Sequence, residues 1–563
     1  MRVYHVLIER FRGIKKLDWS VAGRCICLVG PGDSSKSTIL DAVELALLPR
    51  YGFPFDDSDF HNCDINSPIR IAVTVGPVPR ELAKVSRFGT LLRGWHPAEG
   101  LHDEPEGDDV DVLTVQLSVD QSLEPQWCVV REQNPEGKNI SYRERQHFGV
   151  VRLGSSPDWE LGWGRNSTLS RLTGAVDNLS DILARASRAA RLHLDQSSNL
   201  LAELSEAASR AQTLGEAFGV QIRDKLQPNL DLQSISIRQG GITLHDGEVP
   251  FRRAGLGSRR LLVLALQKEA ACEGGVTLID EVEHGLEPHR VRQLVRNLKG
   301  DGPLEPSDQV LMATHSATAI EELIASDLGV VRSAAGAVEV RRVSSDLQDV
   351  VRGASEAFLA RSVVVCEGKT EQGVCRALNR IWVGQGALPF ETVGVVSVEG
   401  GGSSAPRRAK CLRELGYSTC FFGDADTELN PTACELEASG VKVVVWADGK
   451  SIEERVLADL PWEGVLELIG SASEDRDAES IRQAVQSRLS QVVLPPALAD
   501  WPDIRETREA IAEAAQTPGK EWFKRVDLGE KLGAIIAKYL DQASGSDLTQ
   551  KIAALRDWIY SDV

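Results

Sequence analysis

The segment from residue 25 to residue 38 constrains the fold of this chain more than any other part of its sequence. The apolar run Cys-Ile-Cys-Leu-Val is followed by Gly-Pro-Gly-Asp-Ser-Ser-Lys-Ser-Thr, and residues 36–48 are typical of a helix. A glycine-containing loop that ends in Lys-Ser and lies between a strand and a helix binds phosphates with its backbone N–H groups. The segment therefore predicts an α/β domain that binds a nucleoside triphosphate.

Individual residues of this loop have distinct expected roles. Lys36 would reach the β- and γ-phosphates of ATP, and the hydroxyl of Ser37 would hold Mg²⁺. Ser35 stands before the lysine, where such loops usually have glycine, and its Cβ would crowd the loop. We therefore expect ATP to bind and its hydrolysis to be slow. The predicted ATP-binding residues of the loop are Gly30, Gly32, Asp33, Ser34, Ser35, Lys36, Ser37 and Thr38.

Further elements of a nucleotide-hydrolysing site follow along the chain. An apolar run leads into Asp280, which would support the Mg²⁺ shell, and Glu281, which would position or activate the attacking water. A second apolar run leads to His315, a candidate sensor of the γ-phosphate. Upstream, Gly257 and Ser258 open a predicted helix and would form an anion site at its N-terminus. The order of these elements favours a complete ATPase domain.

A second group of acidic residues follows two apolar runs in the C-terminal part. Glu367 stands at the end of one predicted strand and Glu371 in the first turn of the next helix. Asp424 and Asp426 follow another strand, and residues two apart can face the same side of a strand. Four carboxylates placed together need cations, and oxygen ligands favour Mg²⁺ or Mn²⁺ over zinc. The pattern predicts a metal site that could cleave phosphodiesters with two ions.

Residues 166–220 interrupt the α/β pattern with two amphipathic helices. Such an insert suggests a helical hairpin. Pairing with a second subunit and packing on the parent domain are equally compatible with its apolar spacing.

These motifs resemble two known domain families. The phosphate-binding loop, the turn at residues 255–258, the run 280–288 and Thr314-His-Ser look like the ABC ATPases of the SMC, RecF and OLD group. Glu367-Gly followed by Asp424-x-Asp resembles the Toprim domain. Together the motifs are similar to the OLD (overcoming lysogenization defect) family, in which an ABC ATPase is fused to a Toprim nuclease. Within it, the chain resembles the class that includes the Gabija antiphage nuclease subunit.

The resemblance implies further site residues and a domain plan. OLD nucleases use an additional glutamate, for which we favour Glu453 over Glu454, and a C-terminal lysine, for which we favour Lys524. The fold class is α/β: an ABC-type ATPase with an inserted helical dimerisation hairpin, then an α/β Toprim domain with a helical C-terminal part. The expected boundaries are 1–165 for the first ATPase part, 166–220 for the insert, 221–345 for the second ATPase part and 346–563 for the Toprim domain.

The same resemblance implies an activity and partners. The expected activity is ATP-binding, Mg²⁺- or Mn²⁺-dependent DNA endonuclease, with two metal ions in the Toprim site and one with ATP. Catalysis would use Glu281 in the ATPase and Glu367, Glu371, Asp424, Asp426, Glu453 and Lys524 in the nuclease. Expected partners are DNA, further copies of the chain in a dimer or tetramer, and a UvrD-like helicase. A role in antiphage defence follows from the same analogy.

Composition limits the alternatives. A net charge of −19 over 563 residues argues against a protein that coats nucleic acid indiscriminately, although it permits local basic patches. The sequence has neither a membrane-spanning apolar run nor a signal peptide, and its ten cysteines are scattered, so we expect a cytoplasmic protein. The main rival is a RecF/SMC-like DNA-repair ATPase with a non-catalytic Toprim docking domain. A topoisomerase or primase fits less well, because no tyrosine stands in an evident DNA-gate domain and a primase would lack the ATPase motifs.

Overall fold

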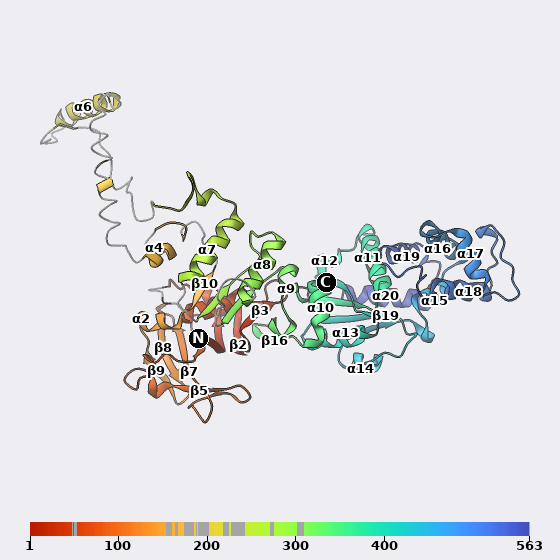
Figure 1. Ribbon diagram of the computed structural model, residues 1–563, viewed down its shortest axis with the longest axis horizontal. Helices are drawn as coiled ribbons and strands as arrows, with labels where there is room; N and C mark the ends of the chain where they lie inside the picture. The colour runs from red at the N-terminus through yellow and green to blue at the C-terminus, as the bar shows by residue number, and fades with distance from the viewer. Residues whose placement is uncertain are drawn as a thin grey trace.

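The computed structural model describes residues 1–47, 49, 53–153, 160–163, 167–173, 185–186, 189, 202–217, 225–226, 242–270, 275–300 and 309–561. Two α/β halves lie end to end (Figure 1). The N-terminal half, coloured red to green, contains one large mixed sheet, and the C-terminal half contains a smaller parallel sheet flanked by helices. The predicted α/β class, with a second α/β unit and a helical C-terminal part, is confirmed.

The large sheet joins a parallel nucleotide-binding part to an antiparallel part. Strands β10, β13, β14, β3 and β15 are parallel to one another. Strand β16 is antiparallel to β15 and parallel to β2, and from β2 through β1 and β4 to β7 each strand is antiparallel to the next. Among the described residues the sheet order is β10 (Val151–Leu153), β13 (Val276–Ile279), β14 (Gln309–Ala313), β3 (Cys25–Val29), β15 (Leu328–Ala334), β16 (Ala337–Arg342), β2 (Ile14–Ser20), β1 (Arg2–Phe11), β4 (Ile69–Gly76), β7 (Val110–Val119), β5 (Arg93–His96) and β6 (Gly100–His102), with β8 (Gln126–Arg131) and β9 (Asn134–Asn139) beside β7.

The central parallel strands are apolar on both faces because helices cover them. All four residues of β13 and all five of β14 are buried, as expected for a parallel sheet between helical layers. The helices of this half are α1 (Lys36–Leu47), α2 (Tyr142–Arg145), α4 (Thr168–Thr173), α6 (Ala202–Ala217), α7 (Leu256–Ala270), α8 (Pro288–Lys299), α9 (Ala317–Glu321) and α10 (Gln348–Gly353). The helix predicted from residue 36 is α1.

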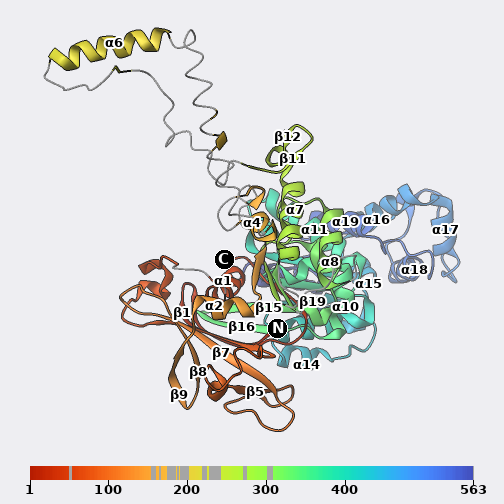
Figure 2. The same cartoon turned by 60° about the vertical axis from the view of Figure 1, so that its left-hand side comes forward.

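The predicted helical insert, residues 166–220, is only partly within the described residues. Helices α4 and α6 belong to it, and most of the chain between them lies outside the description. Figure 2 shows α6 standing away from both sheets, and Figure 1 agrees. Its side chains from residue 206 to 213 are exposed or half-buried.

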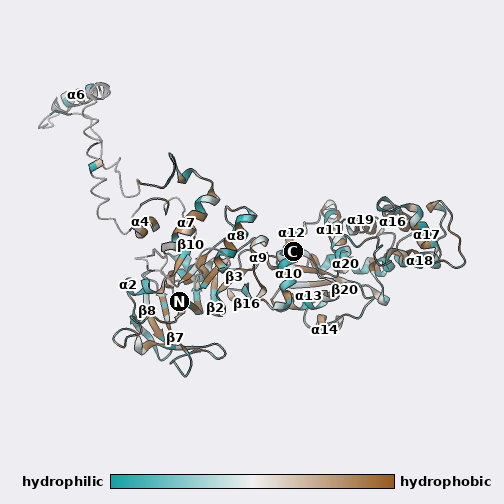
Figure 3. Cartoon of the chain, viewed as in Figure 1, coloured by the Kyte–Doolittle hydropathy of each residue, from teal (hydrophilic) through white to brown (hydrophobic). Residues whose placement is uncertain are grey.

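The C-terminal half is built on a parallel sheet with the order β18 (Val395–Glu399), β17 (Ser362–Cys366), β19 (Ser418–Gly423) and β20 (Lys442–Val445). Since the strands are parallel, their carboxyl ends all lie at one edge. Figure 3 shows apolar residues concentrated on the strands of both halves. The surrounding helices are α11 (Lys369–Gly384), α12 (Phe390–Val393), α13 (Ala405–Glu414), α14 (Ala433–Ala438), α15 (Ile452–Asp459), α16 (Trp462–Asp475), α17 (Ala478–Gln486), α18 (Arg505–Ala515), α19 (Val526–Tyr539) and α20 (Asp547–Ile559).

Glycines let α11 and α19 pack closely. A Cβ at Gly529 would lie 2.5 Å from the carbonyl oxygen of Thr370, and one at Gly533 would lie 2.8 Å from the Cβ of Ala377. Neither position has room for a larger side chain without a shift of backbone. The contact brings a helix from the far C-terminus against the first helix after β17.

One hydrophobic core continues from the N-terminal half into the C-terminal half. It joins Val310 of β14 to Phe358 in the connection and to Val363 and Phe421 of the smaller sheet. Tyr417, also in this core, donates its hydroxyl to the carbonyl of Phe358 at 2.9 Å. The two halves are therefore packed together rather than joined by a free linker. Among the described residues, no helix is both long and apolar enough to cross a membrane.

Candidate functional site

The phosphate-binding loop lies between β3 and α1, and its lysine is held in place without ligand. Lys36 is buried and its Nζ donates to the carbonyl oxygens of Gly30 and Pro31, at 3.1 and 2.8 Å, and to Ser34 Oγ at 3.2 Å. Burial lowers the pKa of Lys36 to about 8, partly offset by Asp280. ATP phosphates would replace these carbonyl groups and favour the charged lysine.

Left-handed backbone shapes the rest of the loop. Ser35 has φ 74° and Asp33 has φ 58°, conformations that cost an L-residue about 1–2 kcal/mol and glycine almost nothing. Ser35 is thus unfavourable compared with glycine because of its backbone conformation, in addition to the crowding predicted from its Cβ. Ser37 and Thr38 lie in the first turn of α1, and Gly32 has open space where a Cβ would be.

Glu283, for which the sequence predicts no role, connects the segments that follow β13 and β14 in the ATPase half. Glu283 accepts a hydrogen bond from Thr314 Oγ1 at 2.5 Å and one from the backbone N–H of His315 at 2.8 Å. Both Glu283 and Asp280 act electrostatically on Lys36. The structure therefore brings the phosphate-binding loop, Asp280 and the His315 turn together, with Glu283 as the link. The sequence around it, Asp-Glu-Val-Glu, gave no signal separating this glutamate from its neighbours.

A buried arginine holds the turn after Asp280. Arg260 donates to the carbonyl oxygens of Asp280, Glu281 and His284 at 3.0, 2.7 and 2.7 Å. Glu281 has φ 45° and its exposed carboxylate lies 3.3 Å from His284 Nδ1. This arrangement leaves the Glu281 side chain accessible to a water or a nucleotide.

Gly257 and Ser258 lie in the first turn of α7, where they contact α8 and the turn before it. Ser258 Oγ accepts from Arg290 of α8 at 3.2 Å. A Cβ at Gly257 would lie 2.6 Å from the carbonyl oxygen of Gly285.

The second site lies at the carboxyl edge of the smaller sheet. Glu367 follows β17, and its Oε2 accepts from the backbone N–H of Asp424 at 2.7 Å. Gly423 permits this contact, because a Cβ there would lie 2.7 Å from the same oxygen. Adjacent parallel strands therefore place Glu367 and Asp424 side by side, as their positions after apolar runs suggested.

Buried carboxylates around Asp424 repel one another. Burial, with further increases from Glu371, Glu453, Glu367 and Asp426, raises the pKa of Asp424 to about 9. Burial likewise raises the pKa of Glu371 to about 7. A bound cation would favour the charged forms of these acids and so lower their pKa values.

The structure distinguishes the two adjacent glutamates of α15. Glu453 is buried, and Glu371 and Asp424 both feel its charge. Glu454 instead completes a capping box with Ser451, since its Oε2 accepts from the Ser451 N–H at 3.0 Å. Only Glu453 therefore stands with the other acids. The Ser-x-x-Glu pattern of a capping box was visible in the sequence and was the signal that separates the two.

Lys524 lies at the same group of acids. Its charge lowers the pKa of Glu367 and of Glu453, in each case against a larger increase caused by burial. The segment is anchored by Thr370, which donates to the carbonyl of Phe523 at 3.0 Å, and by the burial of Trp522. Lys524 lies more than 150 positions after β17, and the contact between α11 and α19 holds it beside Glu367 and Glu453.

The donor set fits magnesium or manganese. Within the described part of the chain, no three acidic, histidine or cysteine side chains already converge as a ready-made metal shell. One oxygen of Asp424 is engaged by the N–H of Ile452 at 2.8 Å and by Trp446 Nε1 at 3.2 Å, and one of Glu371 by the N–H of Gly368 at 2.8 Å. Each acid has a second oxygen, and an all-carboxylate set suits hard divalent cations.

A cavity of about 310 Å³ adjoins Glu367. Hydroxyl groups, one amide and one guanidinium provide most of its polar lining, and aromatic rings are absent from its walls as far as the structure describes them. The lining residues are Glu367, Gly402, Ser403, Ser404, Pro406, Arg407, Thr427, Glu428, Leu429 and Asn430.

Comparisons with known proteins identify two domains in the chain. Residues 178–321 match the family "AAA domain, putative AbiEii toxin, Type IV TA system", and residues 358–426 match "Overcoming lysogenization defect protein-like, TOPRIM domain". No curated protein matches the chain. Solved structures similar to it include the SMC head domain from Thermotoga maritima, at 15% identity, 61% coverage of this chain, 100% of that chain and a TM-score of 0.30. The recombination mediator RecF is also similar, at 14% identity, 60% and 98% coverage, and a TM-score of 0.32. The order of the two family matches, an ATPase domain followed by an OLD-like Toprim domain, matches that of an ATPase–Toprim fusion of the OLD family.

Proposed function

We propose that the protein is an ATP-binding, divalent-metal-dependent DNA endonuclease whose nucleotide state regulates cleavage. One observation carries the proposal: five acids and a lysine from distant parts of the chain meet at the carboxyl edge of the smaller sheet. A domain used only for docking would have no need to gather mutually repelling carboxylates, of which Glu371 and Glu453 are buried, because such a group destabilises the fold without a cation. The residues are Glu367, Glu371, Asp424, Asp426, Glu453 and Lys524.

The acids would hold two Mg²⁺ or Mn²⁺ ions, which supply an activated water and stabilise the leaving oxygen when bound. The protein's own contribution is placement. Glu367 and Asp424 are fixed by adjacent strands, while Glu371 and Glu453 come from the first turns of α11 and α15. Lys524 would stabilise the negative charge that develops on the phosphate during cleavage.

The cavity beside Glu367 would take the DNA backbone next to the scissile phosphate. Its hydroxyls and Arg407 suit phosphate and sugar, and the lack of aromatic rings in its lining leaves no surface on which a base would stack. We therefore expect contacts that position DNA without reading its sequence. Arg407 is paired with Asp346 at 2.9 Å and is 64% exposed, so DNA phosphate would have to compete with that carboxylate.

The ATPase half would bind one Mg²⁺–ATP through Lys36, Ser37 and Asp280. Glu281 would orient the attacking water, and His315 would sense the γ-phosphate. Gly257 and Ser258 would act on the nucleotide of a second copy, as the resemblance to ABC ATPases implies. ATP binding would then join two chains, in a dimer or tetramer, through the ATPase half and the helical insert.

The resemblance to the class of the Gabija nuclease supports a role in antiphage defence in the cytoplasm, with a UvrD-like helicase as partner. Fold-level analogy is the basis of this biological assignment. It is tested by phage plating efficiency on cells that express the chain with and without a neighbouring helicase gene.

The biochemical proposal is tested with supercoiled plasmid. Purified full-length protein is incubated with Mg²⁺ or Mn²⁺, with and without ATP, beside Asp424→Ala, Lys36→Ala and Glu437→Gln. The last variant removes an exposed acid of α14 and serves as the matched control. We expect cleavage by the wild type and by Glu437→Gln, none by Asp424→Ala, and an altered ATP response in Lys36→Ala. DNA binding without cleavage under every condition would instead favour the repair ATPase with a non-catalytic Toprim domain.

A further inference from the structure

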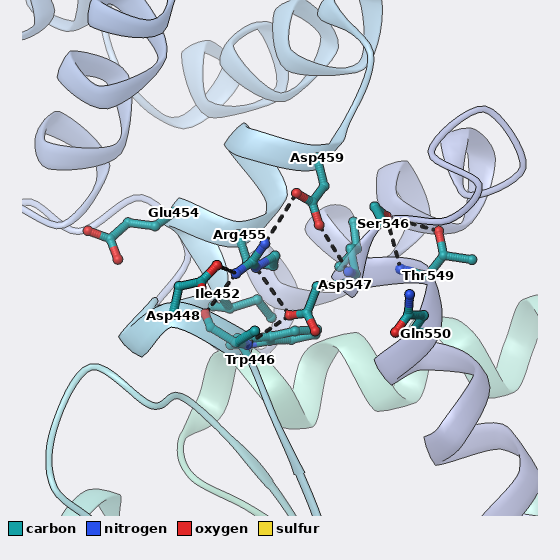
Figure 4. Close-up of polar contacts among 12 residues, drawn as sticks. Trp446, Asp448, Ile452, Glu454, Arg455, Asp459, Ser546, Asp547, Thr549 and Gln550 are labelled. Atoms are coloured by element: carbon teal, nitrogen blue, oxygen red, sulfur yellow. Dashed lines mark hydrogen bonds and ion pairs between the residues drawn. The ribbon is translucent and has the colours of Figure 1, made fainter.

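A buried arginine stands two residues after Glu453, outside the group of acids. Arg455 is 5% exposed and lies in α15. Figure 4 shows its guanidinium between Asp459 of the same helix, Asp448 of the preceding loop and Asp547 at the start of α20. These carboxylates are separate from those of the proposed metal site.

The contacts of this arginine join three segments of the chain. Its Nη2 donates to the carbonyl oxygen of Ala447 at 2.7 Å and to Asp448 at 3.3 Å, and its Nη1 donates to Asp459 at 3.4 Å. Its Nε lies 3.2 Å from Asp547. The planar guanidinium thus donates to one carbonyl and two carboxylates and forms an ion pair with a third, an arrangement that the single ammonium group of lysine would not reproduce.

Two of the aspartates also hold backbone. Asp547 accepts from the N–H of Ala447 at 2.8 Å, and Asp459 accepts from the N–H of Leu548 at 3.0 Å. The loop after β20, helix α15 and the N-terminus of α20 are therefore fixed to one another around Arg455. Helix α20 is nearly a hundred positions away in sequence, and these contacts add to the apolar packing of Leu548 and Ile552 in the core that also contains Trp446 and Ile452.

The opposite side of the same segment supports the metal carboxylates. Trp446 and Ile452 both donate to one oxygen of Asp424, at 3.2 and 2.8 Å. Glu453 is the residue after Ile452 and is buried among the acids. A shift of this segment would move Glu453 and withdraw both donors from Asp424.

From this geometry we infer that Arg455, with Asp547, is a positioning residue of the Toprim metal site: it fixes residues 446–453 so that Glu453 and the donors to Asp424 stay in place. The C-terminal helix α20 is on this account part of the support of the site. The inference rests on the metal site of the proposed function and adds the residues that hold it together. Removing partners that orient metal ligands typically weakens metal binding about 10–100-fold.

The test compares Arg455→Gln with Arg508→Gln in the full-length protein. Arg508 is also largely buried and holds the other end of α15, donating to the carbonyl oxygens of Leu457 and Leu460 at 2.6 and 2.9 Å. Mn²⁺ binding is measured by calorimetry and the unfolding temperature by differential scanning fluorimetry. We expect Arg455→Gln to weaken Mn²⁺ binding at least about tenfold, and Arg508→Gln to lower the unfolding temperature while leaving the Mn²⁺ affinity within about twofold.

Asp547→Asn provides a second, milder variant if Arg455→Gln does not fold. It keeps an acceptor for the Ala447 N–H and removes the charge beside Arg455, so Mn²⁺ binding should weaken severalfold. Wild-type affinity in the folded variant, or equal weakening in Arg508→Gln, would overturn the inference. Absence of Mn²⁺ binding by the wild type would overturn it too. A wild-type chain that binds Mn²⁺ but cuts no DNA would refute only the nuclease, because the positioning role is judged on metal affinity alone.

Discussion

Binding of a divalent ion to the Toprim acids should release protons. The pKa of Asp424 is raised to about 9 and that of Glu371 to about 7, chiefly by burial. At pH 7 the first is about 99% protonated and the second about half protonated, whereas a metal binds the deprotonated forms. Loading the site with Mn²⁺ at pH 7 should therefore release about 1.5 protons, rising to about 2 at pH 6 and falling to about 1 at pH 8.

The same linkage fixes the pH dependence of the affinity. Summing both groups, Mn²⁺ should bind about a thousandfold more weakly at pH 6 than at pH 8. The stability of the metal-free fold depends on pH in the opposite direction, falling as pH rises. The folded pKa values of both acids exceed their unfolded values, so their stabilising contribution is complete below about pH 4 and is lost as pH rises through the folded values. Metal-free protein should thus lose stability toward pH 9, and Mn²⁺ should restore more of it at pH 8 than at pH 6.

Titration calorimetry in two buffers of different ionisation enthalpy measures the proton release directly. Measurements at pH 6, 7 and 8 provide an internal control, because the number of protons released must fall as pH rises. A release near zero, or one independent of pH, would show that the acids are already ionised without metal. Burial would then not raise the pKa values of Asp424 and Glu371 enough to keep them protonated at pH 7.

Three substitutions, one of them with a control variant, test other contacts. Ser35→Gly relieves about 1–2 kcal/mol of left-handed strain, partly offset by the entropy of glycine, and should raise the rate of ATP hydrolysis; an unchanged rate in a phosphate-release assay would discard the strain as its cause. Glu283→Ala removes the acceptor that holds the His315 turn, so hydrolysis should fall while binding of a fluorescent ATP analogue stays within a few fold, and loss of both would point to a misfolded loop instead. Gly529→Ala forces α11 and α19 apart and should cost about 1–3 kcal/mol in denaturant unfolding. Gly470→Ala, where a Cβ meets open space in α16, should stabilise by up to about 1 kcal/mol, and equal effects of the two changes would refute the close-packing argument.

The sequence could predict what is local to a strand end. Lys36, Asp280, Glu367 and Asp424 each follow an apolar run, and the carboxyl ends of parallel strands place such residues at one edge. The α/β class and the order of the two domains followed from the same runs. The predicted insert, by contrast, lies largely outside the described residues, and its pairing with a second subunit stays a prediction.

Contacts between distant segments were not predictable from local pattern. Asp547 meets Arg455 only because α20 packs beside α15, and no spacing in the sequence encodes that. The role of Glu283 depends on a hydrogen bond to the turn after a neighbouring strand. Lys524 was placed by family resemblance; the physical reason for its position, the glycine contact at Gly529, appears only in the packed fold.

The hydrophobic core shared by the two halves means that the Toprim half moves together with the ATPase half. Val310, one strand away from the phosphate-binding loop, and Phe421, next to the metal-binding edge, belong to one packed interior. Densely packed interiors move as units, so a rotation of one ATPase against another would swing the attached Toprim sites through a fixed arc. In an assembly of two copies, the distance between the two cuts in DNA would then be set by how the ATPases face each other. Whether the assembly nicks DNA or cuts both strands would then depend on how bound nucleotide sets the arrangement of the two ATPase halves.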